Sequence, residues 1–233
     1  ALLLGLFAFL SQVLALFRDR SIAHFIGPSP LLDAYYAAFR VPDLIFICIA
    51  SLASITVIIP FIVARMNGEL VTPEAQKYLD DIFTVFLTVI MSVSVIAFFL
   101  MPYLVPFIAP GFSGAMQSKV IMLSRIMLLS PILMGLSNLF GTVTQLFRKF
   151  FIYSLSPIFY NIGIIVGVIF FYPIFGISGL ALGVAFGALM HFGIQALASF
   201  GCGFMPRFSR KINFNDIKAV ALTSLPRTFG LAF

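Results

Sequence analysis

Long apolar runs separated by short polar breaks form the main pattern along the chain. Six runs reach the length of about 20 residues that a helix needs to cross the hydrocarbon core of a membrane. They cover Leu2–Ile26, Leu31–Val63, Ile82–Ile108, Ile121–Phe147, Tyr153–Tyr172 and Ile177–Phe200. Several runs exceed this length, and two prolines lie inside the second, so we expect tilted or kinked helices. The pattern predicts an all-α, polytopic transmembrane helix bundle with six complete spanning helices.

The last part of the chain departs from this pattern. A polar and basic stretch over 206–218 follows the sixth run, and residues 219–233 return to apolar side chains. We therefore divide the chain into a six-helix lobe over 1–205, a cytoplasmic basic connector over 206–218, and the start of a seventh helix and second lobe over 219–233. Because the first residue already lies inside an apolar run and the last lies inside the seventh, we expect a fragment of a longer protein.

Lysine and arginine are distributed unevenly between the two predicted sides of the membrane. One side has three basic residues: Arg18 and Arg20 near the first hairpin, and Lys119 before the fourth run. The other side carries eight near the helix ends: Arg65, Lys77, Arg148, Lys149, Arg207, Arg210, Lys211 and Lys218. Because cytoplasmic loops carry an excess of basic residues, we expect the amino terminus in the cytoplasm.

Composition narrows the class of protein. The chain is 61% hydrophobic and 9% charged, with a mean hydropathy of +1.13, which leaves too little polar surface for a soluble domain. We expect the net charge of +6 to set topology and to meet anionic membrane lipids, with no nucleic-acid partner. The sequence has no H-E-x-x-H and no glycine-rich phosphate loop, and its two cysteines indicate no metal site. We therefore expect neither enzymatic activity nor a cofactor.

Ionisable residues inside the first apolar run are the strongest indication of a function. An Arg or Asp at the centre of a membrane costs about 2.5–3.5 kcal/mol, so such side chains are expected to face protein or a wet cavity. Ser11 and Arg18 are seven residues apart and share one helical face, and Gln12 and Asp19 form a second such pair beside them. This spacing predicts a polar stripe along the first helix.

A second polar stripe is predicted on the second helix. Asp33, Tyr36, Arg40 and Asp43 lie within about 80° of arc, and Ser51 and Ser54 continue the stripe. Two such stripes on consecutive helices favour a hydrophilic cavity between them. The alternative is that the arginines extend to lipid headgroups at a short hairpin, paired with Asp19 and Asp33.

Polar residues in the later runs allow two interpretations. In the fourth run they are Ser137, Asn138, Gly141, Thr144 and Gln145, and in the fifth Ser156, Tyr160 and Asn161. Both sets could line a pathway or could form hydrogen bonds between helices. His191 and Gln195 share a face of the sixth run, and we interpret them as a buried, hydrogen-bonded pair.

Glycines recur at intervals of four in the last two runs. Gly163 and Gly167 lie in the fifth run, and Gly179, Gly183 and Gly187 lie in the sixth. Small residues at this interval allow helix backbones to approach closely in lipid. The spacing favours a packing seam between the two helices over a face that lines a substrate path.

Four segments together resemble the MurJ/MviN-type lipid II flippases of the multidrug/oligosaccharidyl-lipid/polysaccharide exporter superfamily. The D-A-[YF]-[YF]-x-A-F-[RK]-x-P pattern in the second of them is fairly specific, and the similarity extends over nearly the whole chain. The segments are S-Q-V-L-A-L-F-R-D over 11–19, L-D-A-Y-Y-A-A-F-R-V-P-D-L over 32–44, S-P-I-F-Y-N-I-G over 156–163 and G-L-A-L-G-V over 179–184.

The resemblance implies two six-helix lobes around a central cavity that opens alternately to the two sides of a bacterial inner membrane. This chain would be the first lobe, and its lipid-linked substrate would be lipid II. Arg18, Asp19 and Asp33 match charged positions needed for flipping, and Ser11 and Asn161 match cavity positions. An Arg18-containing cavity would bind the diphosphate of the substrate. Arg40 is a possible additional cation.

Two departures from the family pattern leave the exact substrate open. Gln12 stands where many members have Arg, and Phe46–Ile47 where many have a basic pair. The alternatives are therefore a flippase or exporter of another lipid-linked glycan or of a drug, or a non-transporting cell-wall membrane scaffold. An intramembrane enzyme acting on polyprenyl phosphates is disfavoured because no acid–base constellation is present in the sequence.

Overall fold

The computed structural model describes residues 2–50, 55–68, 71–220 and 222, and these fold almost wholly into helices. Ser51 and Ser54, which we expected to extend the second polar stripe, lie outside the described residues. So does most of the predicted seventh helix, over 219–233.

Five helical stretches in the described part of the chain are long and apolar enough to cross a membrane. Three are single helices: α1 (Leu2–Ile26), α5 (Pro73–Ile108) and α10 (Ile177–Gly201). The other two are composite, and consist of α6 (Gly114–Met127) with α7 (Leu129–Leu146), and of α8 (Phe150–Val166), the π-helical turn η2 (Gly167–Phe171) and α9 (Tyr172–Phe175). The predicted all-helical membrane bundle is confirmed.

The second predicted span is divided into shorter helices. These are α2 (Pro30–Ala38), α3 (Arg40–Ala50) and α4 (Ile55–Val63). Proline has no backbone N–H, so Pro42 leaves the carbonyl of Ala38 without its helical partner. The hydroxyl of Ser124 on α6 donates to this carbonyl over 3.0 Å. The expected kink is therefore present at Phe39, between α2 and α3.

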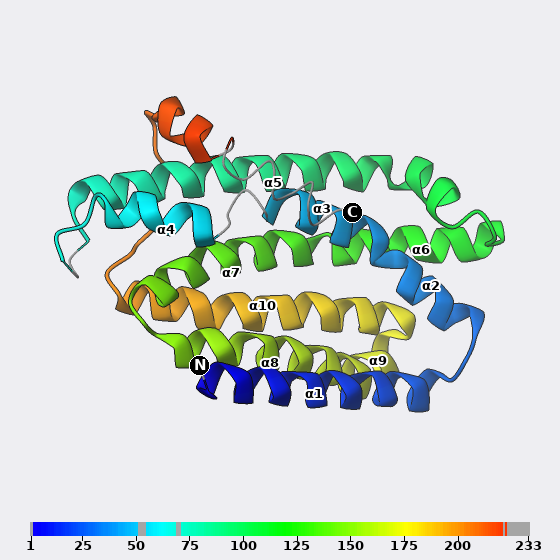
Figure 1. Ribbon diagram of the computed structural model, residues 1–233. Coiled ribbons are helices and arrows are strands. Elements are labelled where there is room, and N and C mark those ends of the chain that lie inside the picture. The colour runs from blue at the N-terminus through cyan, green and yellow to red at the C-terminus, as the bar shows by residue number, and fades with distance from the viewer. Residues whose placement is uncertain (1, 51–54, 69–70, 221, 223–233) are drawn as a thin grey trace.

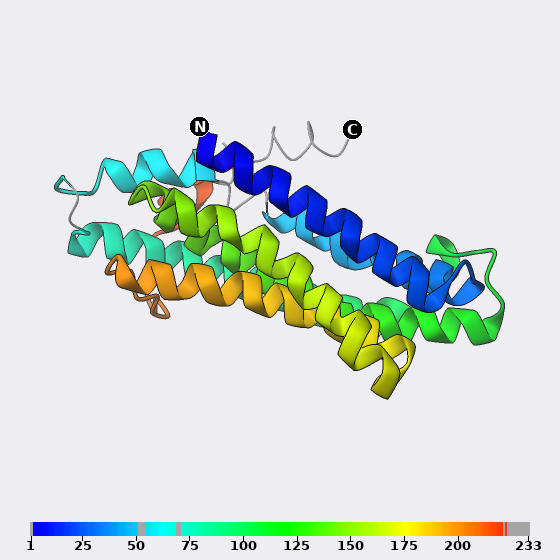
Figure 2. The ribbon, with the colours of Figure 1, turned by 90° about the horizontal axis from the view of Figure 1, so that it is seen from below.

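The long helices run side by side, as Figure 1 shows. Helix α10 packs between α7 and α8, while α1 packs on α8 and α5 packs on α6 and α7. Figure 2 shows α1 lying along one edge of the bundle. Ile22 is the one buried residue among those described in α1, so most of this helix is available to lipid or to a further part of the protein.

The glycine repeat forms a packing seam between α8 and α10. A Cβ atom on Gly163 would lie 2.2 Å from the Cα atom of Gly187, and one on Gly167 would lie 2.4 Å from the Cα atom of Gly183. Real Cβ atoms essentially never approach other atoms this closely. The two backbones are therefore in direct contact, and the packing interpretation of the repeat is confirmed.

The predicted His191–Gln195 pair is buried, but each member bonds to neighbouring helices and not to the other. Nδ1 of His191 lies 2.7 Å from the hydroxyl of Ser137 on α7. The amide of Gln195 accepts from Thr144 on α7 over 2.8 Å and donates to Ser156 on α8 over 2.6 Å. His191 and Gln195 share one face of α10, but their side chains point outward to residues of α7 and α8. The predicted bond between the two was therefore wrong. Ser137, Thr144 and Ser156 thus form interhelical hydrogen bonds.

Candidate functional site

Arg18 lies at the centre of a polar cluster between α1 and α8. Its Nη2 atom is 2.8 Å from Oδ1 of Asp19, and its Nε–H donates to the same oxygen over 2.8 Å. Its Nη1–H donates to Oδ1 of Asn161 over 2.9 Å. The Arg18 side chain is 23% exposed, which places the guanidinium against the neighbouring helix. Arg18 therefore faces protein.

Asn161 connects the two members of the predicted heptad pair. It is buried, and its Nδ2–H₂ group lies 3.3 Å from the hydroxyl and 3.4 Å from the carbonyl oxygen of Ser11. The same group donates to the carbonyl of Pro157, one turn earlier in α8, over 3.0 Å. These bonds hold the amide oxygen of Asn161 toward Arg18. Ser11 and Arg18 thus share the face of α1 that packs on α8, as their spacing predicted.

The polar residues that we expected around one cavity lie in two separate places. Asp33 and Arg40 line a separate cavity of about 600 Å³, together with Tyr36 and the loop over 108–112 that follows α5. The Nη1–H of Arg40 donates to the carbonyl of Ile108, at the carboxyl end of α5. Gln12 is exposed on α1, and the bonds of the Arg18 cluster run through Ser11, Asp19 and Asn161.

The proposed pairing of arginines with aspartates at the hairpin holds for one arginine only. Arg18 pairs with Asp19, whereas Arg40 bonds to a backbone carbonyl of α5. The helical wheel placed Asp33 and Arg40 on one continuous helix with the following polar residues. Asp33, Tyr36 and Arg40 do share one face across the break at Phe39, where they line the same cavity.

The Arg18 cluster has the chemistry of an anion site. A guanidinium has five N–H donors in a planar fork, and the contacts within the cluster use one N–H on each of its three nitrogens. These contacts leave two N–H groups of the guanidinium for a ligand. Asp19 and Asn161 set the orientation of the guanidinium. A planar fork held in this way suits the paired oxygens of a phosphate or carboxylate.

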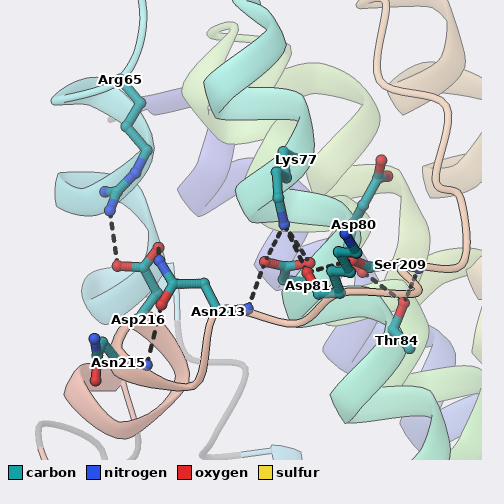
Figure 3. A network of polar contacts seen from close by, with 10 residues as sticks. Arg65, Lys77, Asp80, Asp81, Thr84, Ser209, Asn213, Asn215 and Asp216 are labelled. Carbon is teal, nitrogen blue, oxygen red and sulfur yellow. Dashed lines mark hydrogen bonds and ion pairs between the residues drawn. The ribbon is translucent and has the colours of Figure 1, made fainter.

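A second polar network lies at the opposite end of the bundle, and sequence reasoning missed it. It joins the first turns of α5 to the connector over 206–218 through Lys77, Asp80, Asp81 and Thr84 (Figure 3). Its signal in the sequence is the pair Asp80–Asp81 four residues after Gln76 and Lys77, because residues at this interval are neighbours on a helix.

Comparison with known proteins gives one consistent result. A family model described as lipid II flippase MurJ matches residues 22–233. A probable lipid II flippase MurJ of Rhizobium tropici is 26% identical over 93% of this chain and 42% of its own length. The lipid II flippase MurJ of Burkholderia cenocepacia is 24% identical over 97% of this chain and 45% of its own length.

The fold agrees with a solved structure. The inward closed conformation of a lipid II flippase MurJ superposes with a TM-score of 0.77 and covers 97% of this chain at 23% identity. This chain covers 47% of the chain in that structure. It therefore spans less than half of the length of the relatives that it matches.

Proposed function

Because this chain belongs to the lipid II flippase MurJ family, we propose that it is the first lobe of a transporter that moves lipid II across the bacterial inner membrane. Transport proceeds by alternating access between two lobes. The second lobe corresponds to the part of the relatives that lies beyond the region matched by this chain. The family membership and the apolar helices support a multi-pass membrane protein. The basic excess supports an amino terminus in the cytoplasm.

The physical problem for such a transporter is the charged headgroup. A diphosphate cannot enter hydrocarbon without a partner for its charge, because an isolated buried anion is very costly. A cation in a wet cavity neutralises it, and a guanidinium does so with two parallel N–H···O bonds. The prenyl tail can remain in the lipid while the headgroup passes.

The observation that carries the proposal is the orientation of Arg18. Two neighbours hold its guanidinium, Asp19 on α1 and Asn161 on α8. An arginine that extended to the headgroups would have no need of a buried amide partner on another helix. In this proposal Arg18 binds the diphosphate, Asp19 and Asn161 set its geometry, and Ser11 orients Asn161.

The cavity lined by Asp33 on α2 and Arg40 on α3 supplies a second polar surface for the headgroup. Gln12 lies beside the Arg18 cluster and adds polarity without charge. The neutral Gln12, which stands where many family members have Arg, is the reason for one alternative substrate, another lipid-linked glycan with the same diphosphate. A cation-exporting drug transporter is disfavoured, since Arg18 and Arg40 would repel its substrate.

The experiment compares Arg18→Lys and Arg18→Ala in the full-length protein, with complementation of a flippase-depleted bacterium and lipid II transport in liposomes as readouts. Losing a charge-assisted hydrogen bond costs about 1.5–3 kcal/mol, so we expect transport to fall about 10- to 100-fold for Arg18→Lys. Arg20, which is exposed two residues later, provides the control Arg20→Lys, which should transport normally. Removing a charge makes insertion easier, so protein abundance should stay normal in Arg18→Ala. Full transport by Arg18→Ala at normal abundance would refute the proposal.

A further inference from the structure

The connector over 206–218 is held on α5 through its backbone. Three of its amides donate to side chains of α5: Arg207 to Asp80 Oδ1 over 2.9 Å, Ser209 to Thr84 Oγ1 over 2.9 Å, and Asn213 to Asp81 Oδ2 over 3.1 Å. Figure 3 shows these side chains directed from α5 toward the connector. Bonds to backbone amides fix the path of a chain whatever its side chains are. We call this contact the α5 clasp.

Side chains of α5 also donate to a carbonyl of the connector and to the carbonyl of the residue just before it. Nζ of Lys77 donates to the carbonyl of Lys211 over 2.9 Å, and the amide of Gln76 donates to the carbonyl of Met205 over 2.8 Å. The clasp therefore holds the backbone at several points between 205 and 213. A segment bound in this way by both donors and acceptors has little freedom to slide along α5.

Asp81 is the centre of the clasp. Its side chain is 2% exposed, and the Lys77 ammonium lies 2.9 Å from Oδ2. A carboxylate at this depth needs partners for its charge, and removing one partner of a buried pair is strongly destabilising. Because one of those partners is the Asn213 amide, the cost of exposing Asp81 holds the connector in place.

A second anchor follows directly in the chain. Asp216 pairs with Arg65, in the turn after α4, over 2.9 Å, and the Arg65 guanidinium lies 4.8 Å from the centre of the Tyr78 ring on α5. Ile217 and Val220 then line a small apolar space with residues of α3 and α5. The path of the chain is thus fixed on the first lobe up to residue 220.

We propose that Asp81, with Asp80 and Thr84, is a positioning residue for transport: the α5 clasp holds the connector so that the first lobe and the start of the following segment move as one body. This inference rests on the proposed function, because it concerns movement between two lobes. Asp81 acts through the connector and has no contact with the substrate.

The experiment uses the full-length protein with Cys48 and Cys202 replaced by Ser. Asp81→Ala removes the acceptor for the Asn213 amide, while Asp81→Asn keeps an acceptor oxygen. We expect faster hydrogen exchange over 205–213 and a loss of lipid II transport in Asp81→Ala, with smaller effects in Asp81→Asn. Glu74→Ala, which removes an exposed carboxylate seven residues earlier on α5, is the matched control and should change neither readout.

A cross-link separates positioning from a general effect on folding. Thr84→Cys with Ser209→Cys, joined by oxidation, replaces the clasp by a covalent bond. We expect the joined protein to transport lipid II normally, and the same bond to restore transport to Asp81→Ala. Reversible loss of transport on oxidation would overturn the inference, because it would mean that the connector must leave α5. Failure of the bond to rescue Asp81→Ala would overturn it as well.

The two proposals fail differently. A parent protein that moved no lipid II would refute the proposed function, and with it the transport role of the clasp, even if Asp81→Ala still sped up exchange over 205–213. A parent that transported lipid II, with Asp81→Ala equally active despite faster exchange, would refute the positioning role and leave the proposed function intact.

Discussion

The close contact between α8 and α10 gives a quantitative prediction. In Gly183→Ala, the new Cβ atom on α10 would lie 2.6 Å from the Cα atom of Gly167 and 3.3 Å from the carbonyl oxygen of Ile164, both on the α8 side. Ordinary contact begins at 3.4 Å, and the atoms in the way belong to backbone. The helices must therefore separate by most of an ångström, which opens the seam along its length.

The expected cost follows from overpacking. Inserting one carbon into a well-packed interface typically costs about 1–3 kcal/mol, whereas alanine is intrinsically about 1 kcal/mol better than glycine within a helix. Gly193→Ala is the matched control, because Gly193 lies on the same helix and a Cβ atom added there would meet nothing within 4 Å. The free energies of unfolding of the two variants should therefore differ by about 1–3 kcal/mol, with Gly183→Ala the less stable.

Unfolding in one detergent, followed by circular dichroism because the chain has no tryptophan, measures this difference. We expect a lower unfolding midpoint for Gly183→Ala and an unchanged or higher one for Gly193→Ala. Equal midpoints for the two variants would show that the backbones are not in contact.

Two further predictions concern the buried amide and the orientation. Gln195→Leu removes the partner of Thr144 and Ser156 and should lower the free energy of unfolding by about 1–3 kcal/mol. Gln145→Leu is the control and should cost little, because Nε2 of Gln145 has no partner among the described residues. Equal losses of stability in the two variants would contradict this prediction. With Cys48 and Cys202 replaced, Asn67→Cys should resist labelling by an impermeant maleimide outside intact cells while Ser113→Cys is labelled, and the reverse pattern would show that the amino terminus is outside.

Five of the six predicted spans correspond to long apolar helical stretches in the described part of the chain, but the helix ends were not predictable from the apolar pattern. The third run was predicted to begin at Ile82, whereas α5 begins at Pro73. Its first turns are polar, so hydropathy does not mark them. The signal that does is local: Thr72 caps the helix by accepting from the N–H of Ala75, and proline occupies the first position.

The candidate site was half predictable for a similar reason. Heptad spacing correctly placed Ser11 and Arg18 on one face of α1, because α1 is a single unbroken helix. The same geometry placed Asp33 and Arg40 together, and they line one cavity although Phe39 separates α2 from α3. No local pattern could pair Arg18 with Asn161, which lies 143 residues away and reaches it through the packing of α8 on α1.

Prolines explain many of the other polar contacts within the spans. A proline frees the carbonyl four residues before it, and in lipid no water is available to satisfy that group. Three such carbonyls accept from the side chain of a neighbouring helix: Ala38 from Ser124 over 3.0 Å, Phe98 from Arg125 over 3.0 Å, and Tyr153 from Gln195 over 3.4 Å. Each of these donors therefore satisfies the backbone that Pro42, Pro102 or Pro157 has left open.

Arg18 and Arg40, the two arginines that we considered as substrate-binding cations, have different hydrogen-bond partners. Arg40 donates to the carbonyl of Ile108, which ends α5 and so has no partner within its own helix. Arg18 is different, because its contacts are with two side chains, Asp19 and Asn161, and no open carbonyl requires a cation there. The proposed function explains a charged group that is placed at such a cost within a span and oriented by an amide from another helix. Arg18 is therefore the residue on which a test of substrate binding should begin.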